Sequence, residues 1–274
     1  MPLVAAAVCP HPPLIVPELA GAAAPELAEL RAACAAAVTA LYAAGAATVV
    51  LVGSGGHTAE LDLPRQGSFA PWGLPLAVRL GGGSTRTDPG GGDDLLPLSL
   101  LVGAWLVDRV APPTPTAWRM VSVGPDEPVD RCAALGAGLG VDGPWALLVL
   151  GDGSSCHGPK APGYDDPRAG AYDEGVARAL ADADADALLG LDPAVSAQLG
   201  AAGRPAWQVL AGAVRAAGGD WRGELRHHSH PYGVGYLVAS WSRPTQAGPG
   251  EDHADATVPV AVGPGGAWTG GPAR

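Results

Sequence analysis

Residues 3–8 (LVAAAV) and 47–52 (ATVVLV) are short apolar runs, and residues 25–44 (PELAELRAACAAAVTALYAA) between them carry apolar side chains at helical spacing. This order predicts a strand, a helix and a second strand. A parallel unit of this kind is right-handed and places the carboxyl ends of both strands at one edge of the sheet. Open parallel sheets bind ligands at that edge, so the loops that follow the two strands are candidates for a site.

The same alternation continues along the chain. Further strands are predicted at residues 75–80, 118–124, 145–151 and 233–241, and helices at residues 95–110, 128–140, 167–183, 193–201 and 205–217. The glycine-rich residues 81–94 predict a surface loop. We therefore predict one α/β domain over residues 1–243, with three layers, a mainly parallel central sheet and helices on both faces. Residues 244–274 lack periodicity and predict a disordered tail.

The composition indicates a globular protein with an acidic surface. Hydrophobic residues make up 47% of the chain, charged residues 16%, and the net charge is −11. An acidic chain without a Lys/Arg cluster is a poor partner for nucleic acid or anionic membranes. The longest apolar stretch, Leu95–Val107, is too short to span a bilayer, and the N-terminus lacks the features of a secretory signal. We expect a cytoplasmic protein whose four cysteines are reduced.

Two histidines directly follow the first two predicted strands. His11 lies in CPHPPL and His57 in GSGGHT, 46 positions further on. A single loop histidine is most simply a surface or hydrogen-bonding residue. Two imidazoles brought to the same sheet edge instead favour a divalent metal site. The glycines before His57 do not fit a dinucleotide-binding motif, and the chain has no G-x-S-x-G hydrolase motif.

Four segments together resemble the class III extradiol ring-cleavage dioxygenase superfamily, and in particular its subunit-B-like members. They are PHPPLIVPELAG, GSGGH, GDGSSCHGPKAPGYDD and PYGVGYLVASW, and the similarity runs from about residue 2 to 241. The same superfamily holds the Memo-like proteins. The resemblance implies a metal-dependent oxidoreductase that opens a catechol-type or aminophenol-type aromatic ring with O₂.

The resemblance also implies the roles of several residues. It assigns His11 and His57 to a non-haem Fe(II) held by two histidines and one glutamate, a geometry that leaves positions for catecholate and O₂. It assigns His157, in GDGSSCH, to acid/base catalysis, for which imidazole is suited near neutral pH. Asp152 is expected to orient His157 or a metal ligand.

The third metal ligand is where the sequence departs from the family pattern. Glu224 is the carboxylate closest to the last predicted strand, and His228 or His230 is the alternative ligand. A site made of histidines alone would suit Zn(II) or Cu(II) as well as iron. Two other functions therefore stay open: a Memo-like copper or redox protein without ring cleavage, and a zinc-dependent hydrolase or lyase on the same scaffold.

Further residues near these motifs have expected roles in substrate or metal binding. Lys160 and Tyr164 are expected to hold an anionic group of the substrate, with an ordinary surface position as the alternative. Cys9 and Cys156 each precede a candidate histidine, so a Cys₂His₂ zinc site is conceivable, although two buried thiols explain them more simply. The resemblance further implies assembly, either as a homo-oligomer or with a separate small subunit.

Overall fold

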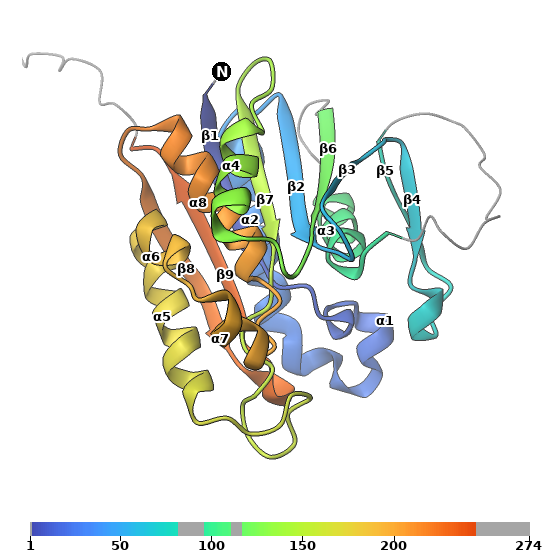
Figure 1. The fold of residues 1–274 in the computed structure, drawn as a ribbon. Coiled ribbons are helices and arrows are strands. Elements are labelled where there is room, and N and C mark those ends of the chain that lie inside the picture. The colour runs from blue at the N-terminus through green and yellow to red at the C-terminus, as the bar shows by residue number, and fades with distance from the viewer. Residues whose placement is uncertain (1, 82–95, 111–116, 245–274) are drawn as a thin grey trace, which may run out of the picture. The chain divides into compact units, whose positions relative to one another are not determined.

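The computed structural model of the chain describes residues 2–81, 96–110 and 117–244 (Figure 1). Almost all of the loop predicted at residues 81–94 and of the tail predicted at residues 244–274 lies outside these ranges. Within the described ranges, seven strands form one sheet and two more form a separate antiparallel pair. The strands are β1 Leu3–Cys9, β2 Thr48–Ser54, β3 Ala59–Leu61, β4 Arg65–Ser68, β5 Ala77–Leu80, β6 Ala117–Val123, β7 Trp145–Leu150, β8 Arg222–Ser229 and β9 Tyr236–Ser242.

The large sheet has the strand order β3-β6-β2-β7-β1-β9-β8. Its four central strands, β6, β2, β7 and β1, are parallel to one another. β9 is antiparallel to β1, and β8 is antiparallel to β9, so β8 runs in the same direction as β1. The ends of β1, β2, β6, β7 and β8 that lead into the following loops therefore lie along one side of the sheet, which we call the carboxyl edge.

Eight α-helices are present in the described ranges. They are α1 Pro17–Ala20, α2 Ala28–Ala43, α3 Leu98–Arg109, α4 Val129–Gly138, α5 Arg168–Asp182, α6 Ala185–Leu189, α7 Pro193–Gln198 and α8 Arg204–Ala217, with short 3-10 helices at Pro13–Ile15, Gly21–Leu27, Ala70–Trp72 and Pro231–Gly233. Asp184 and Asp192 cap α6 and α7 by accepting backbone N–H groups. None of the helices in these ranges is both long enough and apolar enough to cross a membrane.

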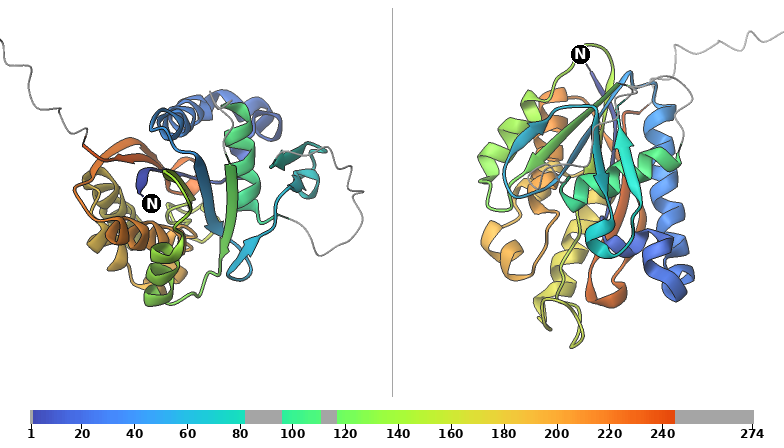
Figure 2. Two further views of the ribbon diagram at one scale, coloured as in Figure 1. Left: turned by 90° about the horizontal axis from the view of Figure 1, so that it is seen from above. Right: turned by 90° about the vertical axis from the view of Figure 1, so that its right-hand side faces the viewer.

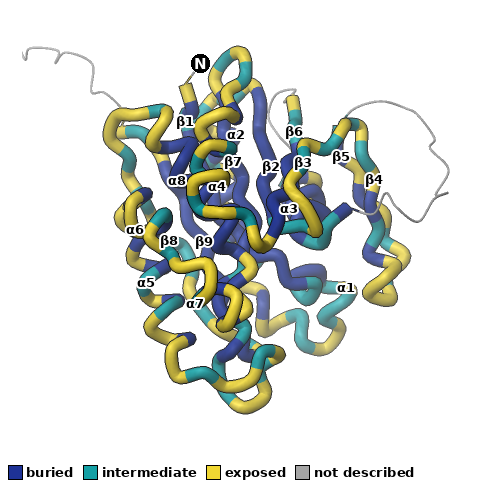
Figure 3. The backbone as a smooth tube through the Cα atoms, in the orientation of Figure 1, coloured by how far each residue is buried: buried dark blue, intermediate teal, exposed yellow. Residues whose placement is uncertain are grey.

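Two hydrophobic cores lie on opposite faces of the sheet. Helices α2 and α3 pack on one face, and α4, α5, α6 and α8 pack on the other (Figure 2). Successive residues of β7 alternate between the cores: Leu148 belongs to the first, and Leu147 and Val149 belong to the second, all fully buried. A strand covered on both faces needs a continuous apolar run, which is the pattern that the sequence shows. Figure 3 shows the resulting buried centre within a more exposed outer layer. The predicted three-layer α/β domain is confirmed.

Several elements differ from the sequence expectation. β8 lies in a segment for which the sequence predicts no strand, because RGELRHHS forms an edge strand whose residues are half-buried or exposed and therefore lacks an apolar run. The short strands β3 and β4 and the helix α6 are also additional. The first long helix begins at Ala28 rather than at Pro25, which lies inside a 3-10 helix.

Candidate active site at the carboxyl edge

The chain reverses its winding direction between two neighbouring strands at the carboxyl edge. β1 leads to α2 on one face of the sheet, whereas β7, its neighbour, leads to α5 on the other face. Ligands of open α/β sheets bind at such switch points, outside the carboxyl ends of the strands. His11 follows β1 and Asp152 follows β7, so both residues lie at this switch point.

His11 and Asp152 are in direct contact. The backbone N–H of His11 donates to Oδ1 of Asp152 over 2.7 Å. The side-chain Nδ1 of His11 lies 3.7 Å from the same oxygen, which is too far for a hydrogen bond. This nitrogen is buried and has no hydrogen-bond partner among the described residues. A buried polar atom without a partner is costly, and its presence at the switch point of the sheet points to a ligand or ion that would satisfy it.

Asp152 lies in an environment that disfavours its negative charge. Burial raises the pKa of the Asp152 carboxyl above its usual range, His11 acts in the opposite direction, and the nearby carboxylate of Asp173 raises the pKa further. Buried charges in proteins are paired or coordinate metals. A cation beside Asp152 would offset the cost of its burial.

The geometry of this pair fits two ligands of one metal ion. Nitrogen and oxygen ligands lie roughly 2.0–2.2 Å from ions such as Zn(II), so two ligand atoms of one ion can be at most about 4.4 Å apart. The 3.7 Å between His11 Nδ1 and Asp152 Oδ1 lies within that limit. Across residues 2–81, 96–110 and 117–244, however, no three His, Cys, Asp or Glu side chains are grouped closely enough to hold a metal. Two donors are in place, and a third is not.

His57 and Glu224, both predicted metal ligands, are exposed. His57 follows β2, the other neighbour of β7, and its backbone carbonyl accepts a hydrogen bond of 2.6 Å from Ser122 Oγ. It follows a strand that ends at the carboxyl edge, but it forms no group of three metal-binding side chains with His11 among the described residues. Glu224 is level with the middle of β1 and two strands away from it, and its carboxylate pairs with Arg226 at 2.7 Å. The structure does not bring Glu224 to His11.

A second histidine–aspartate pair lies in the loop after β7. Nε2 of His157 is 2.7 Å from Oδ2 of Asp173, a residue of α5 with no solvent exposure. The ring of His230, which follows β8, stacks on the ring of His157 with 4.6 Å between centroids and 19° between planes. Asp152, expected to orient either His157 or a metal ligand, contacts His11 instead of His157.

Asp173 is the site residue that the sequence analysis missed. The apolar face of α5 includes Ala169, Val176 and Leu180, and Asp173 lies on that same face. A charged residue within an apolar helical stripe is unusual, and this was the signal available in the sequence. His230, by contrast, was singled out, and the structure brings it to His157.

Backbone hydrogen bonds hold the loop after β7 against the chain before β9. Gly153 N–H donates to the carbonyl of Gly235 over 2.7 Å, Gly235 N–H donates to that of Ser154 over 2.8 Å, and His157 N–H donates to that of Gly233 over 3.1 Å. The segment that carries Asp152 and His157 is thereby fixed to the segment that carries His230. Sequence motifs about 80 residues apart form one structural unit.

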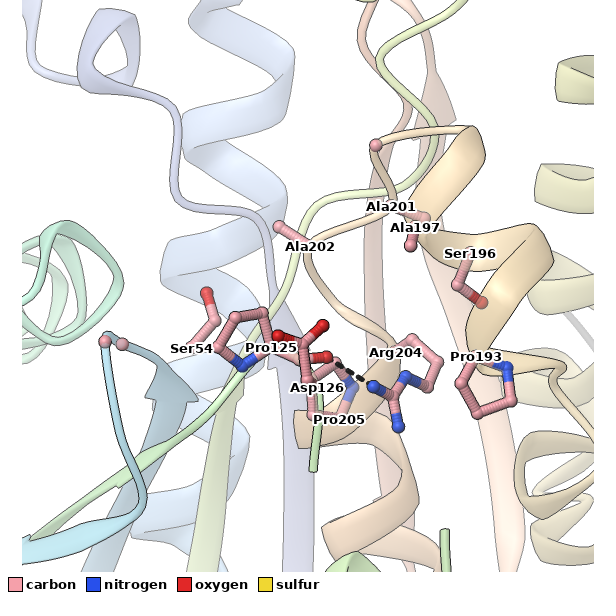
Figure 4. A pocket seen from close by; sticks show the side chains of 13 residues that line it. Ser54, Pro125, Asp126, Pro193, Ser196, Ala197, Ala201, Ala202, Arg204 and Pro205 are labelled. Atoms are coloured by element: carbon pink, nitrogen blue, oxygen red, sulfur yellow. Dashed lines mark hydrogen bonds between the residues drawn. The ribbon is translucent and has the colours of Figure 1, made fainter. Parts of the chain in front are cut away.

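Two cavities open near these residues. One, of about 350 Å³, is lined by His157, His230 and Cys156. The other, of about 500 Å³, lies beyond the ends of β2 and β6 and is lined mainly by glycine, alanine and proline, with Ser54 and Asp126 among its polar residues (Figure 4). Both have volumes suited to a small molecule.

Arg204, which also lines the larger cavity, is engaged by the protein itself. It is buried, and its guanidinium donates to the backbone carbonyls of Pro125 and Glu127 and to Oε1 of Gln208. These contacts join the start of α8 to the loop after β6. They assign Arg204 a structural role in the wall of the cavity.

The remaining predicted residues are placed as follows. Lys160 and Tyr164 are exposed in the loop after β7, and Tyr164 has 84% of its surface accessible. All four cysteines are buried and none forms a disulfide. The Cys156 thiol donates to the carbonyl of Gly163 at 3.1 Å, and burial raises the pKa of Cys132 to about 11.

Comparison with known proteins gives a partial structural likeness. No family model and no curated protein matches the chain at a significant level. The crystal structure of the uncharacterized protein JW3007 from Escherichia coli K12 is similar over 87% of this chain and 99% of that one, with 14% sequence identity and a TM-score of 0.46.

Proposed function

We propose that the chain is a metal-dependent enzyme that opens a catechol-type or aminophenol-type ring with O₂, as the resemblance to the extradiol dioxygenases implies. One observation carries the proposal: the buried Nδ1 of His11 has no hydrogen-bond partner among the described residues and lies 3.7 Å from the carboxylate of Asp152. An imidazole and a carboxylate placed in this way at the switch point of an open α/β sheet could supply two ligands of a metal site.

In this proposal, His11 and Asp152 hold a divalent metal, with Fe(II) first and Zn(II) or Cu(II) as alternatives. We assign His57 as a further ligand, because it is exposed and follows β2, the strand that neighbours β7. Asp152 takes the carboxylate position for which the sequence suggested Glu224. Bound Fe(II) would supply the open coordination positions at which catecholate and O₂ meet.

The protein's own groups provide the proton transfers and the binding surface. His157, beside the 350 Å³ cavity, takes the proton of the aromatic hydroxyl and returns a proton later. His230 packs on its ring. Lys160 and Tyr164, exposed in the same loop, remain the proposed contacts for an anionic group of the substrate.

The proposed setting is the cytoplasm, with a small aromatic substrate as the partner. Four buried thiols without a disulfide favour a reducing compartment. The net charge of −11 argues against nucleic acid as a partner. Assembly as a homo-oligomer or with a small subunit stays part of the proposal.

The test is oxygen consumption by protein loaded with Fe(II) under anaerobic conditions, measured with panels of catechols and aminophenols. We expect turnover in the wild type, loss of both iron and turnover in His11→Ala, and loss of turnover with retained iron in His157→Asn. His228→Asn is the matched control, since His228 is exposed on β8, and it should behave as wild type. No oxygen consumption by the iron-loaded wild type with any compound would overturn the proposal.

One observation favours a second function, that of a Memo-like metal-binding protein without ring cleavage. The described residues bring only two donors together where β1 and β7 end, and a partner molecule could supply the others. Copper or zinc bound through His11 without oxygen consumption would support this function. Turnover that persists without oxygen in the zinc-loaded protein would indicate a hydrolase or lyase instead.

A further inference from the structure

We infer that Asp173 is a positioning residue that fixes the tautomer of His157, so that Nδ1 is the nitrogen that exchanges protons with the substrate. The inference rests on the proposed function only because that proposal assigns acid/base catalysis to His157. The contact itself joins two side chains that are 16 residues apart in the chain and come from different elements.

Both oxygens of Asp173 are occupied. Oδ2 lies 2.7 Å from Nε2 of His157, and Oδ1 accepts the backbone N–H of Ser154 over 2.9 Å. Imidazole is a stronger base than carboxylate, so the shared proton resides on Nε2, which donates to Asp173. A neutral imidazole carries one proton, and Nδ1 is therefore the acceptor.

The protein is built closely around this carboxylate. A Cβ atom added to Gly235 would lie 1.9 Å from Oδ2 of Asp173, and one added to Gly153 would lie 2.5 Å from Oδ1. No real Cβ atom approaches so closely, so both positions require glycine for space. With two glycines, the Ser154 amide and α5 around it, Asp173 has one position available, and His157 is held by a fixed partner.

The free nitrogen of His157 faces a different environment from the bound one. No hydrogen bond to Nδ1 is found among the described residues, while His157 lines the 350 Å³ cavity. The stacked ring of His230 restricts rotation of the imidazole about its own axis. Asp173 and His230 together leave Nδ1 as the atom able to meet a substrate hydroxyl.

The variant Asp173→Asn separates this role from packing. The amide is nearly the same size, and its oxygen must still accept the Ser154 N–H, so its NH₂ group faces His157. An NH₂ group donates, which makes Nε2 the acceptor and moves the imidazole proton to Nδ1. The tautomer should invert while the fold is kept.

The experiment is ¹⁵N NMR of the imidazole nitrogens in metal-free protein at about pH 8.5, where an ordinary imidazole is neutral. The His157 signal is assigned with His157→Asn. We expect the wild type to carry its proton on Nε2 and Asp173→Asn to carry it on Nδ1. Asp166→Asn is the control, because Asp166 lies in the same loop and pairs with Arg168 rather than with a histidine.

Turnover gives the second readout. If the iron-loaded enzyme consumes oxygen, Asp173→Asn should lower kcat at least about 100-fold with KM changed less than about threefold, since the equivalent change in serine proteases costs about 10⁴. A wild-type proton on Nδ1, or an unchanged tautomer in Asp173→Asn, would overturn the inference. If the protein does not catalyse the proposed reaction, the two NMR measurements still test the inference. If Asp173→Asn does not fold, the tautomer of His157 in the wild type tests it alone.

Discussion

The molecule contains two histidine–aspartate pairs at the same sheet edge, and they are held in different ways. Asp152 accepts the backbone N–H of His11 and leaves the His11 ring without a partner, whereas Asp173 binds the His157 ring directly. The first arrangement leaves a buried nitrogen available to an ion. The second orients an imidazole toward a cavity. We therefore propose different roles for the same two residue types, metal binding for the first pair and proton transfer for the second.

The largest expected effect comes from filling the space around the second pair. Gly235→Ala would place a Cβ atom 1.9 Å from Asp173 Oδ2, so the carboxylate or the loop must move. We expect a loss of about 3 kcal/mol in the free energy of unfolding, measured with urea. Gly170→Ala, on α5 with nothing within 4 Å of the added atom, should instead be neutral or stabilise by up to about 1 kcal/mol. Equal stability of the two variants would contradict the close fit.

Metal binding at the His11–Asp152 pair should depend on the negative charge of Asp152 more than on the shape of its side chain. Asp152→Asn retains an oxygen to accept the His11 N–H but removes the negative charge. We expect divalent metal to bind at least 10–100-fold more weakly, measured by calorimetry, with the fold unchanged. The same substitution at Asp173 should change metal affinity little. Similar losses in both variants would mean that the two pairs are not distinct.

The pH dependence of stability offers a finer distinction. The pKa of Asp152 is raised by burial, so the folded chain binds its proton more tightly than the unfolded chain. The stabilisation from this proton is complete at pH values below the pKa of Asp152 in the unfolded chain. It is lost as pH rises through the pKa of Asp152 in the folded chain. Metal-free wild type should therefore gain stability relative to Asp152→Asn as pH is lowered from 7 through the raised pKa. If stability depends on pH in the same way in the wild type and in Asp152→Asn, the raised pKa of Asp152 is contradicted.

The smallest effect is expected at Glu224. Its carboxylate is 61% exposed and pairs with Arg226 at the sheet's edge strand. Exposed pairs contribute about 0–1 kcal/mol, so Glu224→Gln should change stability by less than that and leave metal affinity at the wild-type value. A clear loss of metal affinity in this variant would return Glu224 to the ligand set and displace Asp152.

The strands that could be predicted from the sequence are those whose composition is most strongly constrained by burial. β1, β2 and β7 are buried on both faces and must be apolar throughout, so their runs are visible without a structure. β8 is an edge strand with polar residues, and its pattern resembles a loop. Without a predicted strand there, the register of Glu224 stayed open, and the pairing of Glu224 with Ser240 now places it away from the carboxyl edge.

The candidate site was predictable only as far as the strand ends. His11, Asp152 and His157 follow strands whose order places them at one edge, but which aspartate serves which histidine depends on tertiary contacts. The contact between His157 and Asp173 forms because α5 packs beside the loop after β7, and no local spacing encodes it. The larger cavity likewise arises from α7 and α8 meeting the loops after β2 and β6.

The most direct test of this division of roles is metal binding by His11→Ala and His157→Ala, compared with the wild type by anaerobic titration with Fe(II) and Zn(II). We expect one equivalent of metal in the wild type and in His157→Ala, and none in His11→Ala. Metal retained in His11→Ala, or lost equally in both variants, would contradict the division of roles between the two histidine–aspartate pairs.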